Sequence, residues 1–205
     1  MSLGEHIFAR IYDRFSAQAE KTTFSAHREA LLAGAEGDVV EVGAGTGANL
    51  SHYGDGVATL TITEPSRPMI KRLERKLGES PHEAKVLRAP AEDLPFESDS
   101  FDTVVATLVL CSVDDQPRAL KELRRVLRPG GRLLFMEHVR SEEPKLARLQ
   151  DRMNWLNNLV VHCDCNRPTL DSIEAAGFSI KQLERGTIEK APPFARPLVV
   201  GLAEA

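Results

Sequence analysis

The stretch Asp38-Val-Val-Glu-Val-Gly-Ala-Gly-Thr-Gly-Ala-Asn-Leu50 decides the fold of this chain. A short apolar run is followed by glycines at alternate positions, 43, 45 and 47. Glycine lets a backbone turn with positive φ and approach a ligand that a Cβ would keep away. The residues after the last glycine predict a helix over 47–53, whose first N–H groups would face that ligand. The pattern therefore predicts a ligand-binding loop at the carboxyl end of a first parallel strand.

Strands and helices alternate along the rest of the chain. Apolar runs predict strands over 38–42, 58–63, 84–88, 101–107, 131–138, 178–184 and 196–203. Helical spacing predicts helices over 24–34, 66–78, 115–128, 144–160 and 168–176, after an amphipathic helix from Leu3 to Phe15. Nearly continuous apolar strands between helices indicate an α/β fold with a doubly wound, mostly parallel seven-stranded sheet of the Rossmann-like kind. Ligands of such sheets bind outside the carboxyl ends of the strands.

Length and composition bound the function. The 205 residues fit one domain, which we divide into an N-terminal helical cover (1–34), a ligand-binding core (35–140), an acceptor-side helix and loop (141–170) and a C-terminal part (171–205). The net charge is −4, and the basic runs from Lys71 and from Lys121 alternate with leucines, so we expect solvated helix faces and no nucleic-acid partner. No apolar run approaches the ~20 residues of a membrane span. Three cysteines indicate a reducing compartment, and we expect a cytoplasmic protein.

The glycine loop alone leaves two ligands open. Gly43-x-Gly45-x-x-Ala48 satisfies a dinucleotide fingerprint, and Glu64 follows about 20 residues later, where a ribose-binding acid is expected. The tighter Gly-x-Gly-x-Gly preceded by Glu41 instead favours S-adenosylmethionine (SAM).

Further motifs favour SAM. Glu41-Val-Gly-Ala-Gly-Thr-Gly47, Glu64, Ala91-Glu-Asp-Leu-Pro-Phe96, Phe101-Asp102 and Leu127-Arg-Pro-Gly-Gly131 follow one another in the order seen in class I SAM-dependent methyltransferases, which the chain resembles. A short-chain dehydrogenase would need a Tyr-x-x-x-Lys pair after the loop. The tyrosines are Tyr12 and Tyr53, so that pair is absent from the sequence.

The resemblance implies the cofactor-binding residues. The loop Gly43, Ala44, Gly45, Thr46 and Gly47, with Asn49, is expected to lie against the methionine and ribose parts of SAM, and Glu41 to hold this loop or the amino group. Glu64, followed by Pro65, is expected to accept the ribose hydroxyls. Ala91 and Glu92 are expected to flank the adenine, where Pro90 replaces an acid that family members often carry. Thr107 and Leu108 are expected to cover the methyl-transfer side.

A narrower resemblance covers roughly residues 38–203. Thr107-Leu-Val-Leu-Cys-Ser-Val113, Phe135-Met-Glu-His-Val139, Cys163 with Arg167, and Ala195-Arg-Pro-Leu-Val-Val-Gly201 look like the methyltransferase-like 7 group, described as thiol S-methyltransferases. The animal proteins of that group begin with a membrane-anchoring apolar segment. The chain has an amphipathic helix in its place and is similar to a soluble version. The resemblance implies S-methylation of a small thiol.

Candidate residues for the acceptor side follow from this chemistry. His138 is the candidate catalytic base, because it follows a strand whose carboxyl end faces the cofactor edge; the alternative is a histidine bonded to a backbone carbonyl. Arg167 either offers positive charge to the acceptor or holds the 161–167 loop. Cys111, Tyr12 and Trp155 are further candidates for the substrate wall, although a cysteine after an apolar run is also typical of a buried small hydrophobe.

Several alternatives remain open from the sequence. His162-Cys163-Asp164-Cys165 lacks the spacing of a structural zinc site, so we expect no metal, while an arsenite acceptor is a less favoured possibility. The acceptor could instead be a phospholipid head group or a quinone, or another small molecule methylated at N, O or C. In the phospholipid or quinone case the helix Leu3–Phe15 would contact a membrane surface. A SAM-binding module without catalysis is the remaining alternative.

Overall fold

The computed structural model describes residues 19–80 and 83–205. The strands are β1 (Gly37–Val42), β2 (Val57–Thr63), β3 (Lys85–Leu87), β4 (Phe101–Thr107), β5 (Leu127–His138), β6 (Ser179–Thr187) and β7 (Pro197–Glu204). The helices are α2 (Ser25–Leu32), α3 (Arg67–Leu77), α4 (Gln116–Val126), α5 (Pro144–Val161) and α6 (Thr169–Ala175), with a π-helical turn η1 (Glu20–Phe24) and a 3-10 turn η2 (Pro193–Ala195). The predicted helix Leu3–Phe15 lies outside the described residues.

One seven-stranded sheet has the order β3-β2-β1-β4-β5-β7-β6. The first five strands in this order are parallel, and β7 runs antiparallel to both β5 and β6. After β3, at the edge of the sheet, the chain returns to place β4 beside β1. This reversal of winding puts the ligand-binding edge at the carboxyl ends of β1 and β4. The prediction of a doubly wound, mostly parallel seven-stranded sheet is confirmed.

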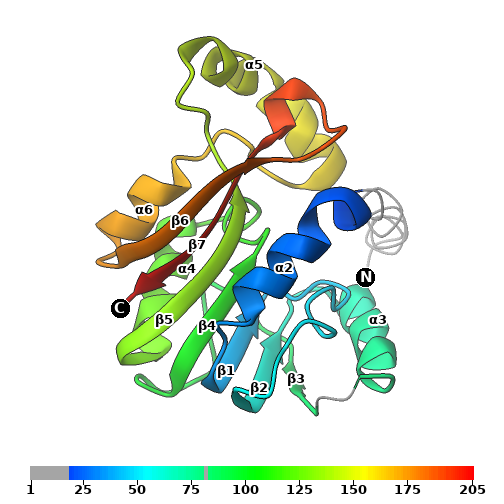
Figure 1. Cartoon of the computed structure of the whole chain (residues 1–205), viewed down its shortest axis with the longest axis vertical. Coiled ribbons are helices and arrows are strands. Elements are labelled where there is room, and N and C mark those ends of the chain that lie inside the picture. Colours follow the sequence, from blue (N-terminus) through cyan, green and yellow to red (C-terminus); the bar gives the residue numbers. More distant parts are fainter. Residues whose placement is uncertain (1–18, 81–82) are drawn as a thin grey trace.

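Helices cover both faces of the sheet (Figure 1). On one face, α4 and α6 pack over apolar strand side chains such as Val104 and Leu133, and α6 contributes Ile173 to this core. On the other, α2 and α3 cover a second core that includes Leu32, Ile62 and Leu73. The long helix α5 lies beyond the carboxyl end of β5, at the top of Figure 1. A parallel sheet needs cover on both faces, which explains its nearly continuous apolar strands.

Basic side chains on α3 are exposed as expected. Lys71, Arg75 and Lys76 face solvent, whereas Met69 and Leu73 of the same helix are buried. None of the helices within residues 19–80 and 83–205 has the length and apolar character needed to cross a lipid bilayer.

One predicted element is wrong. Residues 47–53 form a series of turns and not a helix. All three glycines of the loop have positive φ, and Gly47 N–H donates to the Ala44 carbonyl at 2.9 Å. Two side chains of the following residues, Asn49 and Tyr53, bond to the buried carboxylate of Glu41, and these contacts favour the turns over a helix. The expected helix N-terminus therefore does not contribute to the site.

The strand predicted over 131–138 starts four residues earlier, at Leu127. Leu127 pairs with Phe101 of β4, and the register shifts before Arg132 pairs with Thr103. Gly130, with φ of 76°, lies within this irregular start. The Pro-Gly-Gly segment therefore lies inside the strand, at the position where its register against β4 shifts.

Candidate active site

The glycine loop offers open backbone at one position. A Cβ on Gly43 would lie 2.7 Å from Val109 Cγ2, and one on Gly47 would lie 2.8 Å from Leu73 Cδ1. At Gly45, with φ of 58°, the nearest atom to such a Cβ is Met69 Sδ at 3.8 Å. Packing inside the protein therefore requires glycine at positions 43 and 47. At position 45 the backbone leaves space into which a ligand could fit.

Glu64 holds the glycine loop to β2. Its Oε2 accepts a hydrogen bond from Gly45 N–H at 2.9 Å, and its Oε1 accepts one from Ser66 N–H at 2.8 Å. Burial raises the pKa of the Glu64 carboxyl, while these two N–H groups act in the opposite direction. Next to it, the carbonyl of Pro65 accepts a hydrogen bond from Arg88 Nε. A buried carboxylate thus lies directly against the one open position of the loop.

Glu41 holds the turns that follow the loop. Its carboxylate accepts hydrogen bonds from Asn49 Nδ2 at 2.9 Å and from Tyr53 O–H at 2.7 Å. Burial raises the pKa of Glu41, and burial together with the neighbouring carboxylate raises the pKa of Tyr53 well above its ordinary value. Of the two roles expected for Glu41, these contacts are those of a residue that holds the loop.

Arg28 is a central residue of this region that the sequence analysis missed. It is 4% exposed, and its Nη1 donates to Asn49 Oδ1 at 2.6 Å and to Thr107 Oγ1 at 2.9 Å. Its Nη2 forms a salt bridge with Glu20 at 2.8 Å. The guanidinium therefore connects α2 to the loop and to the carboxyl end of β4. In the sequence Arg28 is one arginine within a predicted helix, and its neighbours do not distinguish it from a surface arginine.

The remaining predicted cofactor residues lie around the same edge. Thr46 is buried, and its Oγ1 lies 3.5 Å from Lys76 Nζ. Ala91 is part of the buried core, and Glu92 accepts hydrogen bonds from the backbone N–H groups of Asp114 and Asp115. Leu108 has φ of 60°, an uncommon conformation for a leucine. The backbone is thus strained where β4 ends, at the side expected to face methyl transfer.

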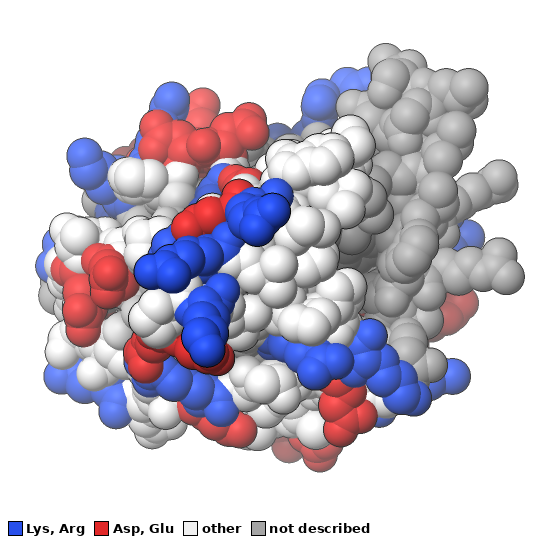
Figure 2. All heavy atoms as spheres, turned by 90° about the horizontal axis from the view of Figure 1, so that it is seen from above, with Lys and Arg blue, Asp and Glu red and all other residues white. Residues whose placement is uncertain are grey.

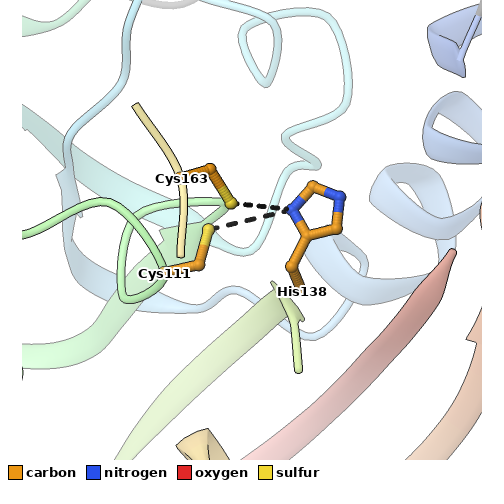
Figure 3. A group of neighbouring side chains, drawn as sticks. All are labelled: Cys111, His138 and Cys163. Atoms are coloured by element: carbon orange, nitrogen blue, oxygen red, sulfur yellow. Dashed lines mark hydrogen bonds between the residues drawn. The ribbon is translucent and has the colours of Figure 1, made fainter. Parts of the chain in front are cut away.

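A cluster of three donor side chains lies at the carboxyl ends of β4 and β5 (Figure 3). His138 Nδ1 lies 3.3 Å from Cys163 Sγ and 3.9 Å from Cys111 Sγ. Both cysteines are buried, and the histidine is partly buried. The hydrogen bond to Cys163, together with burial, raises the pKa of the Cys111 thiol well above its ordinary value. The imidazole therefore lies beside two sulfur atoms. Neither predicted role, a catalytic base or a histidine bonded to a backbone carbonyl, included these contacts.

Glu137 fixes the backbone on which Cys111 lies. Its side chain is fully buried, and it accepts hydrogen bonds from the N–H groups of Val109, Leu110 and Cys111 at 2.9, 3.0 and 3.1 Å. Burial raises the pKa of this carboxyl well above its ordinary value, and the three N–H groups act against that shift. The carboxylate thus accepts hydrogen bonds from backbone N–H groups in the turn after β4, which would otherwise be buried without partners.

The other substrate candidates are placed differently. Arg167 forms a salt bridge with Asp164 at 2.6 Å and donates to the Leu110 carbonyl at 2.9 Å, which are the contacts of a residue that holds its loop. Trp155 does not join the cluster, because it lies on the outer face of α5 and is 66% exposed. The buried face of that helix carries Gln150 instead, which bonds to the carbonyls of Val139 and Cys165. Tyr12 lies outside the described residues.

Charges of both signs surround the edge of the sheet. Figure 2 views the molecule from this side, and Lys and Arg side chains alternate there with Asp and Glu and with uncharged residues.

Comparisons with known proteins agree with this geometry. A methyltransferase domain model matches residues 40–135. The chain is 38% identical to thiol S-methyltransferase TMT1B of Homo sapiens over 83% of its own length and 70% of that protein. It is 32% identical to phosphatidylethanolamine N-methyltransferase of Cereibacter sphaeroides over 70% of its length and 74% of that protein. Among solved structures, a SAM-dependent methyltransferase of Thermotoga maritima, titled a possible histamine N-methyltransferase, has a TM-score of 0.70 and 25% identity, covering 97% of this chain and 98% of that one.

Proposed function

The chain belongs to the SAM-dependent methyltransferases, and on that premise we propose that it methylates the sulfur of a small, mostly apolar thiol. The observation that carries the choice of a thiol is the cluster of Cys111, His138 and Cys163 at the ends of β4 and β5, which we call the acceptor edge. We place the acceptor beside the imidazole of His138, which lies next to the two buried thiols; the group found among the described residues contains no carboxylate. A relative named as a thiol S-methyltransferase, 38% identical over most of the chain, supports the same acceptor.

The residues present fit the cofactor. Space above Gly45 and the adjacent carboxylate of Glu64 provide a backbone cradle with an acceptor for hydroxyl groups. We assign Glu64 to the ribose and the 43–47 backbone to the methionine part. Thr107 and Leu108, at the end of β4, would lie between cofactor and acceptor. SAM supplies a methyl group bonded to a positively charged sulfur, which an incoming nucleophile can displace.

The protein's own task is to align the acceptor and exclude water. A thiol reacts as its thiolate, and a free thiol has a pKa of about 8.5. We propose that His138 accepts the acceptor's proton or stabilises the thiolate by a hydrogen bond. Such a reaction needs little further polar catalysis, which agrees with the apolar residues Leu108 and Val109 at this edge.

An acceptor screen with labelled SAM tests the proposal. Small thiols, phenols, amines and phospholipid vesicles are offered in parallel to the full chain. We expect transfer of label to thiols and little to a matched alcohol or phenol. Preferential labelling of amines or phenols would overturn the thiol assignment and leave the methyltransferase assignment intact.

A second acceptor class has its own support. A relative named phosphatidylethanolamine N-methyltransferase matches 70% of the chain, and Trp155 and Leu159, one helical turn apart on α5, are 66% and 69% exposed. Such a pair could contact a lipid surface, as could the sequence-predicted helix Leu3–Phe15. Co-sedimentation with vesicles, together with labelled lipid in the screen, would favour this alternative.

We further propose a reducing, cytoplasmic location. Its support is that Cys111, Cys163 and Cys165 are free thiols, although two of their sulfurs belong to one cluster.

A further inference from the structure

The cluster of Cys111, His138 and Cys163 has the composition of a metal site. Its three donor atoms lie within 4.8 Å of one another. Two thiolate sulfurs and one imidazole nitrogen select Zn²⁺ and similar thiophilic cations over Mg²⁺ or Ca²⁺, which prefer oxygen. The sequence analysis did not predict this set, because its members come from three separate segments of the chain.

The two sulfur–nitrogen distances lie close to those of tetrahedral coordination. With a Zn–S distance of about 2.3 Å and a Zn–N distance of about 2.05 Å, a tetrahedral ion would place sulfur and nitrogen about 3.6 Å apart. The two observed contacts to His138 Nδ1, 3.3 Å from Cys163 and 3.9 Å from Cys111, bracket this value. Only small side-chain movements would therefore be needed to place an ion between the three donors.

The segments that carry the ligands are held together by other contacts. Asp164 N–H donates to the Cys111 carbonyl at 2.8 Å, which joins the loop after α5 to the turn after β4. Asn157 Nδ2 donates to the Cys163 carbonyl at 2.6 Å, and Glu137 holds the Cys111 N–H. Supporting contacts of this kind position ligands before a metal arrives.

We propose that Cys111, His138 and Cys163 bind one Zn²⁺ or a similar thiophilic divalent cation, with a fourth coordination position that takes the sulfur of the acceptor. The second half rests on the proposed function. Three protein ligands and an open position are the arrangement of catalytic zinc sites. A thiol that coordinates such an ion loses its proton to solvent, with no oxidant or reductant involved. In the cation-bound protein His138 is a ligand, so the ion takes over its role toward the acceptor.

Cobalt binding tests the site without any turnover. The full chain, reduced and freed of metal by a chelator, is titrated with Co²⁺, and Zn²⁺ is used as a competitor. We expect about one ion per chain and an absorption band from thiolate-to-cobalt charge transfer. Loss of a supporting contact typically weakens metal affinity by about 10–100-fold, so Cys111→Ser and Cys163→Ser, which remove a ligand, should weaken it by more than about 100-fold.

Cys165→Ser is the matched control, because Cys165 is also a buried thiol but lies outside the cluster. It should bind Co²⁺ like the parent. Zn²⁺ should raise the melting temperature of the parent and of this control, but not that of Cys111→Ser. This comparison also shows whether each variant is folded. Absence of cobalt binding by the parent, or equal loss in all three variants, would overturn the site.

The open position has its own test. Adding a small thiol to the cobalt-loaded protein should change the visible spectrum, whereas the alcohol of the same shape should not. An unchanged spectrum would mean a closed structural site and would overturn the second half of the proposal. Neither measurement uses SAM, so failure here is distinct from failure of the acceptor screen.

Discussion

Arg28 Nη1 donates to Thr107 Oγ1 at 2.9 Å and so joins two residues that are 79 positions apart. Thr107 is the last residue of β4, where the cofactor edge lies, and Arg28 comes from the helix that covers this part of the sheet. The same nitrogen bonds to Asn49, whose amide bonds in turn to Glu41. A buried chain of polar contacts therefore determines the shape of the loop.

Replacing Arg28 by alanine should destabilise the protein by about 1–3 kcal/mol, because it removes the donor to the buried Asn49 Oδ1 and one of the two donors to Thr107 Oγ1, the other being Asn49 Nδ2. Chemical denaturation measures the change. Arg28→Lys should recover only part of it, since an ammonium lacks the planar fork. Glu29→Ala, at an exposed position of the same helix, is the control and should have little effect. Equal stability of Arg28→Ala and the control would contradict this role.

The loop glycines should separate into two classes. Gly43→Ala places a Cβ 2.7 Å from Val109 and should reduce stability, with a lower melting temperature. Gly45→Ala meets no protein atom closer than 3.8 Å, so it should cost only about 1–2 kcal/mol for its positive φ while weakening SAM binding strongly. Calorimetric titration with SAM and thermal unfolding distinguish the two effects. Parent-like SAM affinity in Gly45→Ala would show that the cofactor does not approach this backbone.

Glu64→Gln should weaken SAM binding by about 2–3 kcal/mol, or about 30–150-fold in Kd, because charge-assisted bonds to the ribose become neutral ones. Burial raises the Glu64 pKa above its ordinary 4.5. The ionised form binds the ribose, so parent affinity should fall as pH drops through that raised pKa. The glutamine variant should lack this dependence. Asp55→Asn, at an exposed site, is the control, and a pH profile shared by all three proteins would remove Glu64 from the ribose site.

The sheet was predictable because its signals are local. Apolar runs and the residues that end them fixed all seven strands to within a few residues, and SAM motifs marked the edge. The predicted helix over 47–53 failed because contacts of Asn49 and Tyr53 with a buried Glu41 outweigh a weak local preference. The role of Arg28 and the contact between His138 and Cys163 could not be predicted from the sequence, because both depend on contacts between distant segments.

Arg128, in the motif Leu127-Arg-Pro-Gly-Gly131, contributes to stability through two carboxylates. Its guanidinium forms salt bridges with Asp38 at 2.9 Å and Asp102 at 2.6 Å, at the beginnings of β1 and β4. Hydrogen bonds from Thr59 and Arg128 hold the pKa of the Asp38 carboxyl below its ordinary 3.8. A hydrogen bond from Arg128 does the same for the pKa of Asp102. The stability that these carboxylates contribute is therefore present above pH 3.8 and lost as pH falls through their lowered pKa values.

Arg128→Gln should raise both pKa values toward 3.8, which carbon-detected NMR titration of the carboxyls can measure. The stability difference between parent and variant should be largest near neutral pH and should shrink below pH 3.8. SAM affinity should not change, since these residues lie at the opposite end of the strands from the cofactor edge. A constant stability difference across this range would mean that Arg128 acts through packing alone.

His138 is the residue whose loss should separate binding from chemistry. His138→Ala removes the imidazole from the acceptor edge, whether it handles the proton itself or holds a cation with Cys111 and Cys163. Turnover of a small thiol should fall by about 100-fold or more, because a positioned proton-transfer group contributes about 10²–10⁴-fold. SAM affinity should remain close to that of the parent, because the hydrogen bonds of this ring go to Cys111 and Cys163, which are not predicted cofactor residues. Steady-state kinetics and calorimetric titration measure the two effects. If His138 is only a strand-end histidine, thermal unfolding would shift while kcat at saturating acceptor stayed near the parent value, and that result would remove it from the catalytic site.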